Sequence, residues 1–411
     1  MKKFFQLTLI TLFMFSFSGV SSATNGDQLI GIGPVSRAMG GVGIAAPQDA
    51  ISAVFANPAA MCFGAYCPGS QFIFAGTVFM PNTRTRVTAD AAGLDTGWKD
   101  SDSDMYVIPA IGISTPITQQ VRFGLAAYGV SGLGVDYRDK FDLNPMTPEI
   151  DDVYTNLQVM KFASSLSYLI NPNFSVGAAL HANYGALDLQ AGTSTGFSVG
   201  AQVGALYKNG PISVGVVYVT PQKINHENVA DFDEDGSADD LELESPQSIG
   251  FGVAYEAIPG VLLVETDAKW LNWADADGYK DFDWANQWVY AIGVQYKPVP
   301  KLALRAGFNY GKNPVEDHDG WDGTTFESVQ GKQVSRFNYE VLRIAGFPAI
   351  VEKHLTAGIG YKVSRNVLIN LGYMHAFKNT IKEDGTYFGM PASVSASLKE
   401  NSIDFGITWT F

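Results

Sequence analysis

The most constraining feature of this sequence is an alternation of apolar and polar residues that recurs along most of the chain. In the last ten residues, Ile403, Phe405, Ile407, Trp409 and Phe411 alternate with Asp404, Gly406, Thr408 and Thr410. Because successive side chains of a β-strand point to opposite faces, the pattern predicts strands with one apolar and one polar face. Fourteen segments follow it, at 70–84, 104–116, 120–136, 152–170, 173–189, 194–208, 211–225, 246–256, 261–273, 285–297, 301–312, 352–363, 366–380 and 398–411.

The composition of the two faces indicates which one meets lipid. The polar faces are rich in Gly, Thr, Asn and single charges, whereas the apolar faces often end in an aromatic residue, as at Trp288, Tyr296, Tyr361 and Trp409. An aromatic girdle beside an apolar band is typical of lipid-facing barrel strands. Beyond residue 23 no run of 18 apolar residues occurs, which excludes helical spans and leaves a large secreted β protein or a transmembrane barrel. The aromatic girdle favours the barrel. We therefore predict an all-β fold, a 14-stranded antiparallel transmembrane β-barrel over residues 70–411.

The connections between these segments support a bacterial outer-membrane location. Short turns at ITQ, NPN, NGP, AIPG, PVP and SRN alternate with longer loops near 85–103, 137–151, 226–245, 274–284, 313–351 and 381–397, although the connection at 190–193 is short. Short periplasmic turns and long extracellular loops are typical of such barrels. The pattern places Phe411 on the periplasmic side.

The first 69 residues do not alternate. Lys2 and Lys3, an apolar stretch and Ser21-Ser22-Ala23 predict a signal peptide over residues 1–23, with a transmembrane anchor as the alternative. Residues 24–69 are glycine-rich with short apolar clusters, which predicts a plug, or hatch, of short helical and irregular segments in the lumen; a disordered leader would be less apolar. Of the 27 basic residues, removal of Lys2 and Lys3 leaves 25 against 41 acidic ones, a net charge of −16 that argues against nucleic acid.

Cys62 and Cys67 are the two cysteines of the chain. In an exported protein such a close pair predicts a local disulfide. A metal site is the alternative, and no histidine lies near the pair in the sequence.

The stretch SRAMGGVGIAAPQDAISAVFANPAAM resembles the N-terminal hatch of the FadL-type outer-membrane transporters of long-chain fatty acids and other hydrophobic compounds, and Asn57-Pro58-Ala59 matches their NPA motif. The blocks KLALRAGFNYGKNPV and FPAIVEKHLTAGIGYKVSRNVLINLGYMHAF also resemble this family, and Phe411 resembles the C-terminal signal read by the barrel assembly machinery. The resemblance implies an internal plug and a kinked third strand through which a hydrophobic ligand leaves sideways. Gly129, Gly132 and Gly134 suit such a kink, although glycines are common on lumen faces.

The resemblance also implies passive uptake of hydrophobic small molecules, with long-chain fatty acids as the first expectation. A carboxylate buried with its acyl chain must be paired or hydrogen-bonded. Alternation places Arg122, Lys161, Lys269 and Arg305 in the lumen as candidates. Structural ion pairs, with Glu265 or Asp267 as partners, are the alternative. Outer-membrane lipid and lipopolysaccharide are the expected surroundings, and a monomer is the simplest oligomeric state.

The loop DFDEDGSADDLE matches the spacing of a calcium-binding loop. Its candidate ligands are Asp231, Asp233, Asp235, Ser237, Asp239 and Glu242, with Gly236 at the turn. No flanking helices are expected, so a solvated acidic loop is the alternative to a structural Ca²⁺ site. No other cofactor is expected.

Three other functions compete with transport of hydrophobic compounds. The five histidines lie far apart and no nucleophile motif accompanies them, so no enzyme is expected. A general diffusion porin for polar solutes would have an open pore. A surface adhesin or receptor would act through loops 226–245 and 313–351.

Overall fold

The structure, a computed structural model, describes residues 25–61, 69–141, 153–189 and 191–411. The predicted signal peptide and the predicted Cys62–Cys67 disulfide lie outside the described residues. Among the described helices, none has the length and apolar character needed to cross a membrane.

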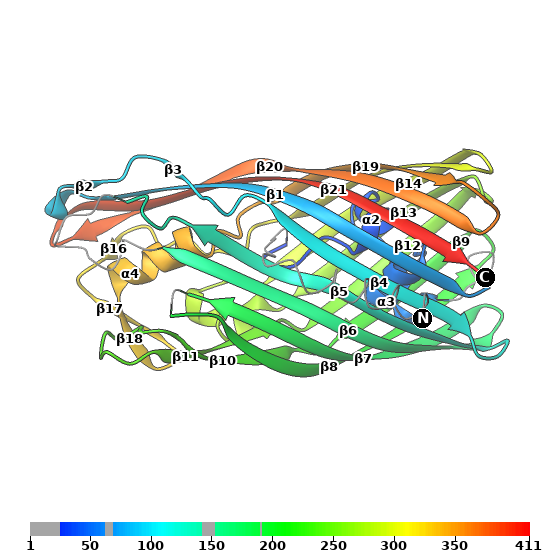
Figure 1. The fold of residues 1–411 in the computed structure, drawn as a ribbon, viewed down its shortest axis with the longest axis horizontal. Coiled ribbons are helices and arrows are strands. Elements are labelled where there is room, and N and C mark those ends of the chain that lie inside the picture. Colours follow the sequence, from blue (N-terminus) through cyan, green and yellow to red (C-terminus); the bar gives the residue numbers. More distant parts are fainter. Residues whose placement is uncertain (1–24, 62–68, 142–152, 190) are drawn as a thin grey trace, which may run out of the picture.

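Fourteen strands in this part of the chain form a closed antiparallel barrel (Figure 1). They are β1 (Gln71–Ala89), β4 (Tyr106–Pro116), β5 (Val121–Asp136), β6 (Tyr154–Asn171), β7 (Phe174–Asp188), β8 (Ser194–Asn209), β9 (Ile212–Val219), β12 (Ser248–Ile258), β13 (Leu262–Leu271), β14 (Gln287–Val299), β15 (Leu302–Gly311), β19 (Lys353–Lys362), β20 (Val367–Tyr387) and β21 (Met390–Thr410). Each pairs with its neighbour, and the ladder from Gln71–Thr410 to Ala89–Ala392 closes the ring between β1 and β21. The predicted barrel is confirmed.

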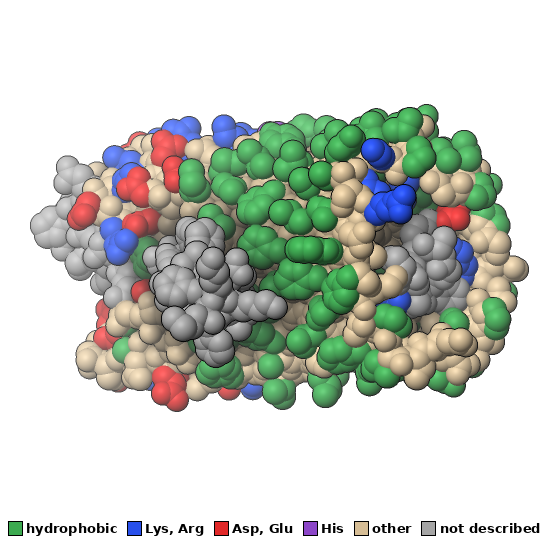
Figure 2. Space-filling model, turned by 45° about the vertical axis from the view of Figure 1, so that its right-hand side comes forward, with side chains coloured by type: hydrophobic (Ala, Val, Ile, Leu, Met, Phe, Trp, Pro, Cys, Tyr) green, Lys and Arg blue, Asp and Glu red, His purple; other side chains and the backbone are tan. Residues whose placement is uncertain are grey.

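The two faces of the strands also match the prediction. On the face shown in Figure 2, a belt of hydrophobic side chains covers the middle of the barrel, and most acidic side chains lie toward one end. On β21, Ile407 and Trp409 are exposed, whereas Asp404 is fully buried in the lumen. Exposing so many apolar side chains to water is unfavourable, so this belt is the surface that meets the acyl chains of lipid.

The predicted loop at 381–397 is wrong. β20 and β21 continue through it as one long hairpin whose last pair is Tyr387–Met390. Alternation did not predict this extension, because the small residues of the sequence ASVSAS differ little in polarity from one face to the other. Val394 and Ala396 within it are nevertheless buried.

Two other predicted loops contain short elements. Residues 222–245 form the hairpin β10 (Gln222–Ala230) and β11 (Asp239–Ser245), so the strand predicted at 211–225 ends early. The cap, which we define as residues 313–351, contains β16 (Trp321–Asp322), β17 (Phe326–Val329), β18 (Lys332–Ser335), α4 (Arg336–Val341) and the π-helical η7 (Leu342–Gly346). Shorter elements near the same end are η3 (Asp90–Ala92), β2 (Leu94–Asp95), β3 (Lys99–Asp100), η5 (Trp273–Asp275) and η6 (Lys280–Phe282).

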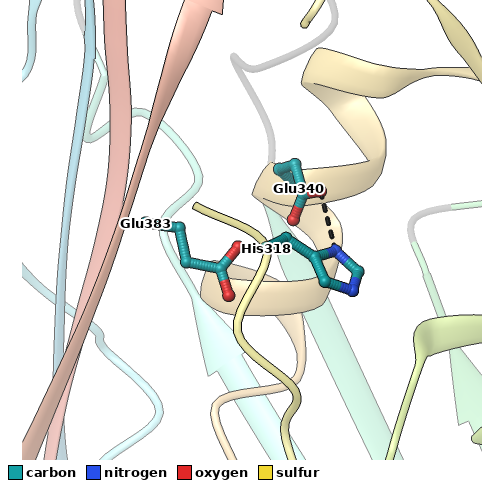
Figure 3. Close-up of side chains that lie close together, drawn as sticks. All are labelled: His318, Glu340 and Glu383. Atoms are coloured by element: carbon teal, nitrogen blue, oxygen red, sulfur yellow. Dashed lines mark hydrogen bonds and ion pairs between the residues drawn. The ribbon is translucent and has the colours of Figure 1, made fainter. Parts of the chain in front are cut away.

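An ion network holds the cap to the barrel, and Figure 3 shows three of its side chains, His318, Glu340 and Glu383. The Arg343 guanidinium donates to Glu340 Oε2 from Nε and Nη2, at 3.0 and 2.8 Å, and to Glu383 of β20. Glu340 Oε1 lies 3.0 Å from His318 Nδ1 and accepts from Arg336 Nε at 2.7 Å. Burial opposes the charge on Glu340, but His318 and Arg343 outweigh it and lower the pKa of that carboxyl. Burial and the neighbouring Glu340 charge raise the pKa of Glu383. Two guanidinium groups already balance the two carboxylates, so His318, Glu340 and Glu383 are a structural network rather than a cation site.

Replacing Arg343 by Met is expected to release the cap, because it leaves two buried carboxylates without their shared counter-ion. Breaking a buried pair in this way costs about 3–5 kcal/mol. Limited proteolysis of the folded barrel should therefore cut within 313–351 faster in the variant. Lys382→Met, which removes an exposed pair with Asp384 on the same strand, is the control and should cost about 0–1 kcal/mol. Equal cutting rates in both variants would contradict the role of the network.

Candidate functional site: the filled lumen

Residues 25–61, the described part of the hatch, lie within the barrel toward the end that carries the C-terminus (Figure 1). The segment forms α2 (Gly33–Arg37), α3 (Ala50–Ala56) and the 3₁₀ turn η1 (Pro58–Ala60). Each start has a local cause: Pro34 stands in the first turn of α2, Asp49 accepts the Ser52 N–H at 2.8 Å, and Asn57 accepts the Ala59 N–H at 3.0 Å. The short helices follow from these caps and from burial of their apolar residues.

Two carboxylates on β13 bind the hatch backbone. Asp267 Oδ2 accepts the N–H groups of Gly43 and Ile44 at 2.9 and 3.2 Å, and Glu265 Oε1 accepts those of Ala45 and Ala46 at 2.8 and 2.9 Å. An irregular buried segment needs partners for its N–H groups, and these acids supply four of them. The sequence suggested these acids only as partners for basic residues. Their spacing, two apart on one lumen face, was the available signal.

The NPA motif fastens the hatch to the neighbouring wall. Asn57 Nδ2 donates to the carbonyl oxygens of Ile44 and Ala205, at 2.9 and 3.2 Å. The Ala59 carbonyl accepts from Ser167 and Ser175 on β6 and β7, at 3.2 and 2.7 Å. Pro58, between them, begins η1. The motif therefore joins two parts of the hatch to three strands.

Glycines on the lumen face of the wall make this close approach possible. A Cβ at Gly204 would lie 2.1 Å from Asn57 Oδ1, and one at Gly177 would lie 2.3 Å from the Ala59 nitrogen. Any larger residue at either position would push the motif off the strand.

A third anchor lies at β21. Arg37 Nε lies 2.7 Å from Asp404 Oδ1, and both side chains are only 1% exposed. Arg37 Nη2 also donates to Ser402 Oγ at 2.8 Å, and Asp404 accepts a hydrogen bond from Thr77 on β1. The hatch is thus tied to the strands that close the barrel.

A cavity remains in the lumen beside the hatch. Apolar and aromatic side chains line much of it: Ile30, Ile44, Phe55, Tyr128 and Val130. The ammonium groups of Lys161 on β6 and Lys269 on β13 face the same space and are close enough to repel each other. Lys269 Nζ lies 5.5 Å from the centre of the Phe55 ring. Among the described residues, no carboxylate forms an ion pair with Lys161.

The other two basic candidates lie away from this cavity. Arg305 donates from Nε to Gln295 at 2.8 Å and from Nη1 to Asn370 at 2.9 Å, within the wall of β14, β15 and β20. Arg122 Nη1 lies 3.5 Å from Ser114 Oγ, near the short-turn end of β4 and β5. The structure therefore brings together Lys161 and Lys269 and separates them from Arg122 and Arg305.

The hydrogen-bond ladder of the wall is interrupted between β4 and β5. Pairing runs from Pro116–Arg122 to Ala110–Tyr128 and stops there, although β5 continues to Asp136 and remains paired with β6. The β5–β6 register shifts between Gly129 and Ser131, so Val130 is an extra residue. Of the three glycines suggested for a kink, Gly129 adjoins this bulge, while Gly132 and Gly134 pair regularly with β6.

The acidic loop between β10 and β11 brings together some of the residues suggested for calcium. Carboxylate oxygens of Asp231, Asp233 and Asp239 lie within 4.8 Å of one another. Lys332 Nζ lies 2.5 Å from Asp239 and 3.3 Å from Asp233. Three other suggested ligands, Asp235, Ser237 and Glu242, are engaged elsewhere: Asp235 accepts from Ser237, and Glu242 pairs with Lys223 at 2.9 Å. The Ca²⁺ site stays a prediction.

These features define a class of protein: an outer-membrane β-barrel whose own N-terminal segment lies in the lumen beside a cavity of mixed apolar and polar lining. The family model described as "Outer membrane protein transport protein (OMPP1/FadL/TodX)" matches residues 28–238, just over half of the chain. The chain belongs to this family and is an outer-membrane transporter of hydrophobic compounds. No curated protein matches the sequence.

Solved structures share the fold. The chain is similar to the toluene transporter TodX of Pseudomonas putida, with 18% identity, a TM-score of 0.67 and coverage of 93% of this chain and 99% of that one. It is also similar to a FadL homologue of Pseudomonas aeruginosa, with 16% identity, a TM-score of 0.68 and coverage of 96% and 100%. For the toluene transporter TbuX of Ralstonia pickettii, the identity is 15% and the TM-score is 0.63, with coverage of 93% of this chain and 99% of that one. The predicted family and outer-membrane location are confirmed, and a family of transport proteins accords with the expected absence of catalysis.

Replacing Asn57 by Ala is expected to loosen the hatch, because the buried Ile44 carbonyl and the part-buried Ala205 carbonyl lose their donor. Each unsatisfied group costs about 1–3 kcal/mol. In planar lipid bilayers the variant should conduct ions more often and more strongly than the parent protein. Asn366→Ala, which removes an exposed hydrogen bond to Thr410, should leave conductance unchanged. A closed Asn57→Ala barrel would contradict the anchoring role of the motif.

Replacing Gly204 by Val is expected to give the same leak by a steric route, since the new side chain would occupy the position of the Asn57 amide. The matched control is Val203→Leu on the lipid-facing side of the same strand, where Val203 is exposed. Conductance traces of the two variants test the close approach. Indistinguishable traces would show that the wall tolerates a side chain at position 204.

Proposed function

We propose that this transporter takes up hydrophobic carboxylic acids, with long-chain fatty acids as the leading substrates, and binds them in the lumen cavity. The observation that carries the proposal is the pair of ammonium groups, Lys161 and Lys269, facing a cavity that apolar and polar side chains share. Two like charges in a buried cavity are unfavourable unless an anion joins them. A carboxylate head group between the lysines would supply that anion.

The rest of the cavity suits the acyl chain. Ile30, Ile44, Phe55 and Val130 offer apolar contacts, and each buried CH₂ group contributes about 0.8 kcal/mol. TodX and TbuX are named for toluene, a neutral aromatic hydrocarbon. Asp267 lines the same cavity and offsets the charge of Lys269. A neutral ligand would leave Lys161 without an ion-pair partner among the described residues, so the Lys161 charge favours an acid over a hydrocarbon for this chain.

The hatch and the wall support a route for release. Residues 25–61 are almost all buried in the lumen, which supports a plug rather than an open pore for polar solutes. The interruption of the β4–β5 ladder lies beside the cavity, since Tyr128 and Val130 line the cavity and also flank the point where pairing stops. We propose that the ligand leaves sideways there, past the bulge at Gly129, into the outer leaflet.

The setting we propose is a monomeric barrel surrounded by outer-membrane lipid and lipopolysaccharide. Phe411, at the end with the short turns, is proposed as the residue that the barrel assembly machinery reads. The segment 24–69 is proposed to act as the plug.

Replacing Lys161 and Lys269 together by Met tests the substrate class. Loss of charge-assisted hydrogen bonds worth about 1.5–3 kcal/mol each should weaken binding of a fluorescent long-chain acid by at least about 10-fold. The methyl ester of the same acid should bind the variant and the parent protein equally. Titration in detergent and uptake into proteoliposomes provide the two measurements.

Lys301→Met, in an exposed turn, is the control for overall charge. If the double variant lost the acid and the ester equally, the lysines would have a structural role instead. If the parent protein formed an open, ion-conducting pore, a general diffusion porin would be favoured. Uptake unaffected by every variant, with surface binding lost on deletion of 313–351, would favour an adhesin.

A further inference from the structure

The first described residues of the hatch occupy the place beside β5 that β4 leaves vacant. The Leu29 N–H donates to the Val130 carbonyl at 3.2 Å, and the Gly132 N–H donates to the Asp27 carbonyl at 3.1 Å. Gln28 forms an antiparallel bridge with Ser131 between these two bonds. The chain's own N-terminal segment therefore replaces the missing strand partner across the interruption.

The Asp27 side chain joins three separate elements at this point. Its Oδ2 accepts hydrogen bonds from the Ser131 hydroxyl of β5 and from the Tyr279 hydroxyl of the β13–β14 connection. The residue is only 2% exposed. Its other oxygen, Oδ1, has no hydrogen-bond partner among the described residues. The carboxyl is thus buried, held by two hydroxyl groups, and incompletely satisfied.

An aromatic pocket fixes the chain on the other side. The rings of Trp273, Tyr279 and Trp284 lie with centroids 4.7–5.1 Å apart. Gly26 sits against them with φ +66°, and a Cβ there would lie 2.6 Å from the Trp273 ring. Only glycine combines this backbone conformation with this approach. Asn25 and Gln28 line the lumen cavity, so a ligand in the cavity would touch the residues on both sides of Asp27.

We propose that Asp27 is the positioning residue that closes the interrupted wall, and that its release from Ser131 and Tyr279 frees the lateral route. This inference rests on the lateral release proposed above. It assigns the closing step to one carboxyl group that joins the hatch, the bulged strand and an extracellular connection.

The ionisation of Asp27 makes this closure dependent on pH. Burial raises the pKa of Asp27 to about 6, although hydrogen bonds from Ser131 and Tyr279 oppose the rise. Tyr279 stays a donor, because burial and the Asp27 charge raise its own pKa. Ser131 from β5 and Tyr279 from the β13–β14 connection are the groups that face the carboxyl, and no charged side chain is among the influences on its pKa.

The raised pKa of Asp27 determines how closure changes with pH. Closed Asp27 holds its proton more tightly than released Asp27, whose ordinary pKa is 3.8. Closure is therefore strongest below about pH 4, weakens as the pH rises toward 6, and is weakest above that value. The difference of about two pH units corresponds to about a 100-fold change in the ratio of released to closed states.

Hydrogen exchange of the intact protein in lipid nanodiscs tests the proposal directly. The readout is the exchange of the Leu29 and Gly132 amides, corrected for the intrinsic pH dependence of exchange. In the parent protein, protection should fall by up to about 100-fold between pH 4 and pH 7. Asp27→Asn, which keeps an acceptor for both hydroxyl groups but does not ionise, should remain protected and lose the pH dependence. Asp27→Ala should expose both amides at every pH.

Asp49→Asn is the matched control, since it alters another buried hatch carboxyl that caps α3, and it should keep the parental profile. An unchanged profile in Asp27→Asn, or full protection in Asp27→Ala, would overturn the proposal. Tyr279→Phe gives a second check and should weaken protection at all pH values.

Uptake of the long-chain acid separates this inference from the proposed function. If Asp27→Asn slows release of acid into the bilayer at pH 7 while its binding in the cavity is unchanged, both stand. If the parent protein takes up no acid but the exchange profiles behave as expected, the substrate class fails and the closure stands. If acid is taken up equally fast with and without the Asp27 closure, the closure fails and the substrate class stands.

Discussion

The structure depends on one constraint: every backbone polar group at membrane depth must find a partner within the protein. Closure of β1 onto β21 satisfies the strands, but a barrel of this size encloses a wide lumen. The N-terminal segment fills that lumen in an irregular conformation, which brings a second set of N–H and C=O groups into a buried place. Side chains of the wall meet this demand, above all Glu265 and Asp267, which accept four hatch N–H groups.

The need of the hatch backbone for hydrogen-bond partners engages some polar residues of the lumen and leaves others unengaged. Glu265, Asp267 and Asp404 are held by the hatch, either by its backbone or by Arg37. Lys161 and Lys269 have no such partner in the hatch and face the cavity instead. Asp267 also lines the cavity beside Lys269, so Lys161 is the cavity charge that has no carboxylate partner among the described residues. An anionic ligand would supply a partner for that charge.

The same constraint accounts for the position of the hatch N-terminus. Where β5 leaves β4, its free edge lies in the wall of the barrel, and an unpaired edge there is costly. Asp27 to Leu29 pair with that edge. A partner that belongs to a short segment, held by one carboxyl and an aromatic pocket, can be released far more easily than a strand held by a full ladder. Closure and opening of the wall are therefore assigned to different parts of one continuous chain.

The sequence alone determined the number of barrel strands, the face that meets lipid and the end that carries Phe411, because a period of two and the length of a turn are local properties. It also indicated the hatch and the NPA motif, through resemblance. It missed the extended β20–β21 hairpin, whose small residues give weak contrast. Only the tertiary structure decided that Lys161 and Lys269 share a cavity while Arg122 and Arg305 do not, since alternation gives the face of a residue but not its height or its neighbour across the lumen. No local sequence pattern marks Asp27. Its role depends on the path of the hatch, which brings it to Ser131, about 100 residues away, and to Tyr279, about 250 residues away.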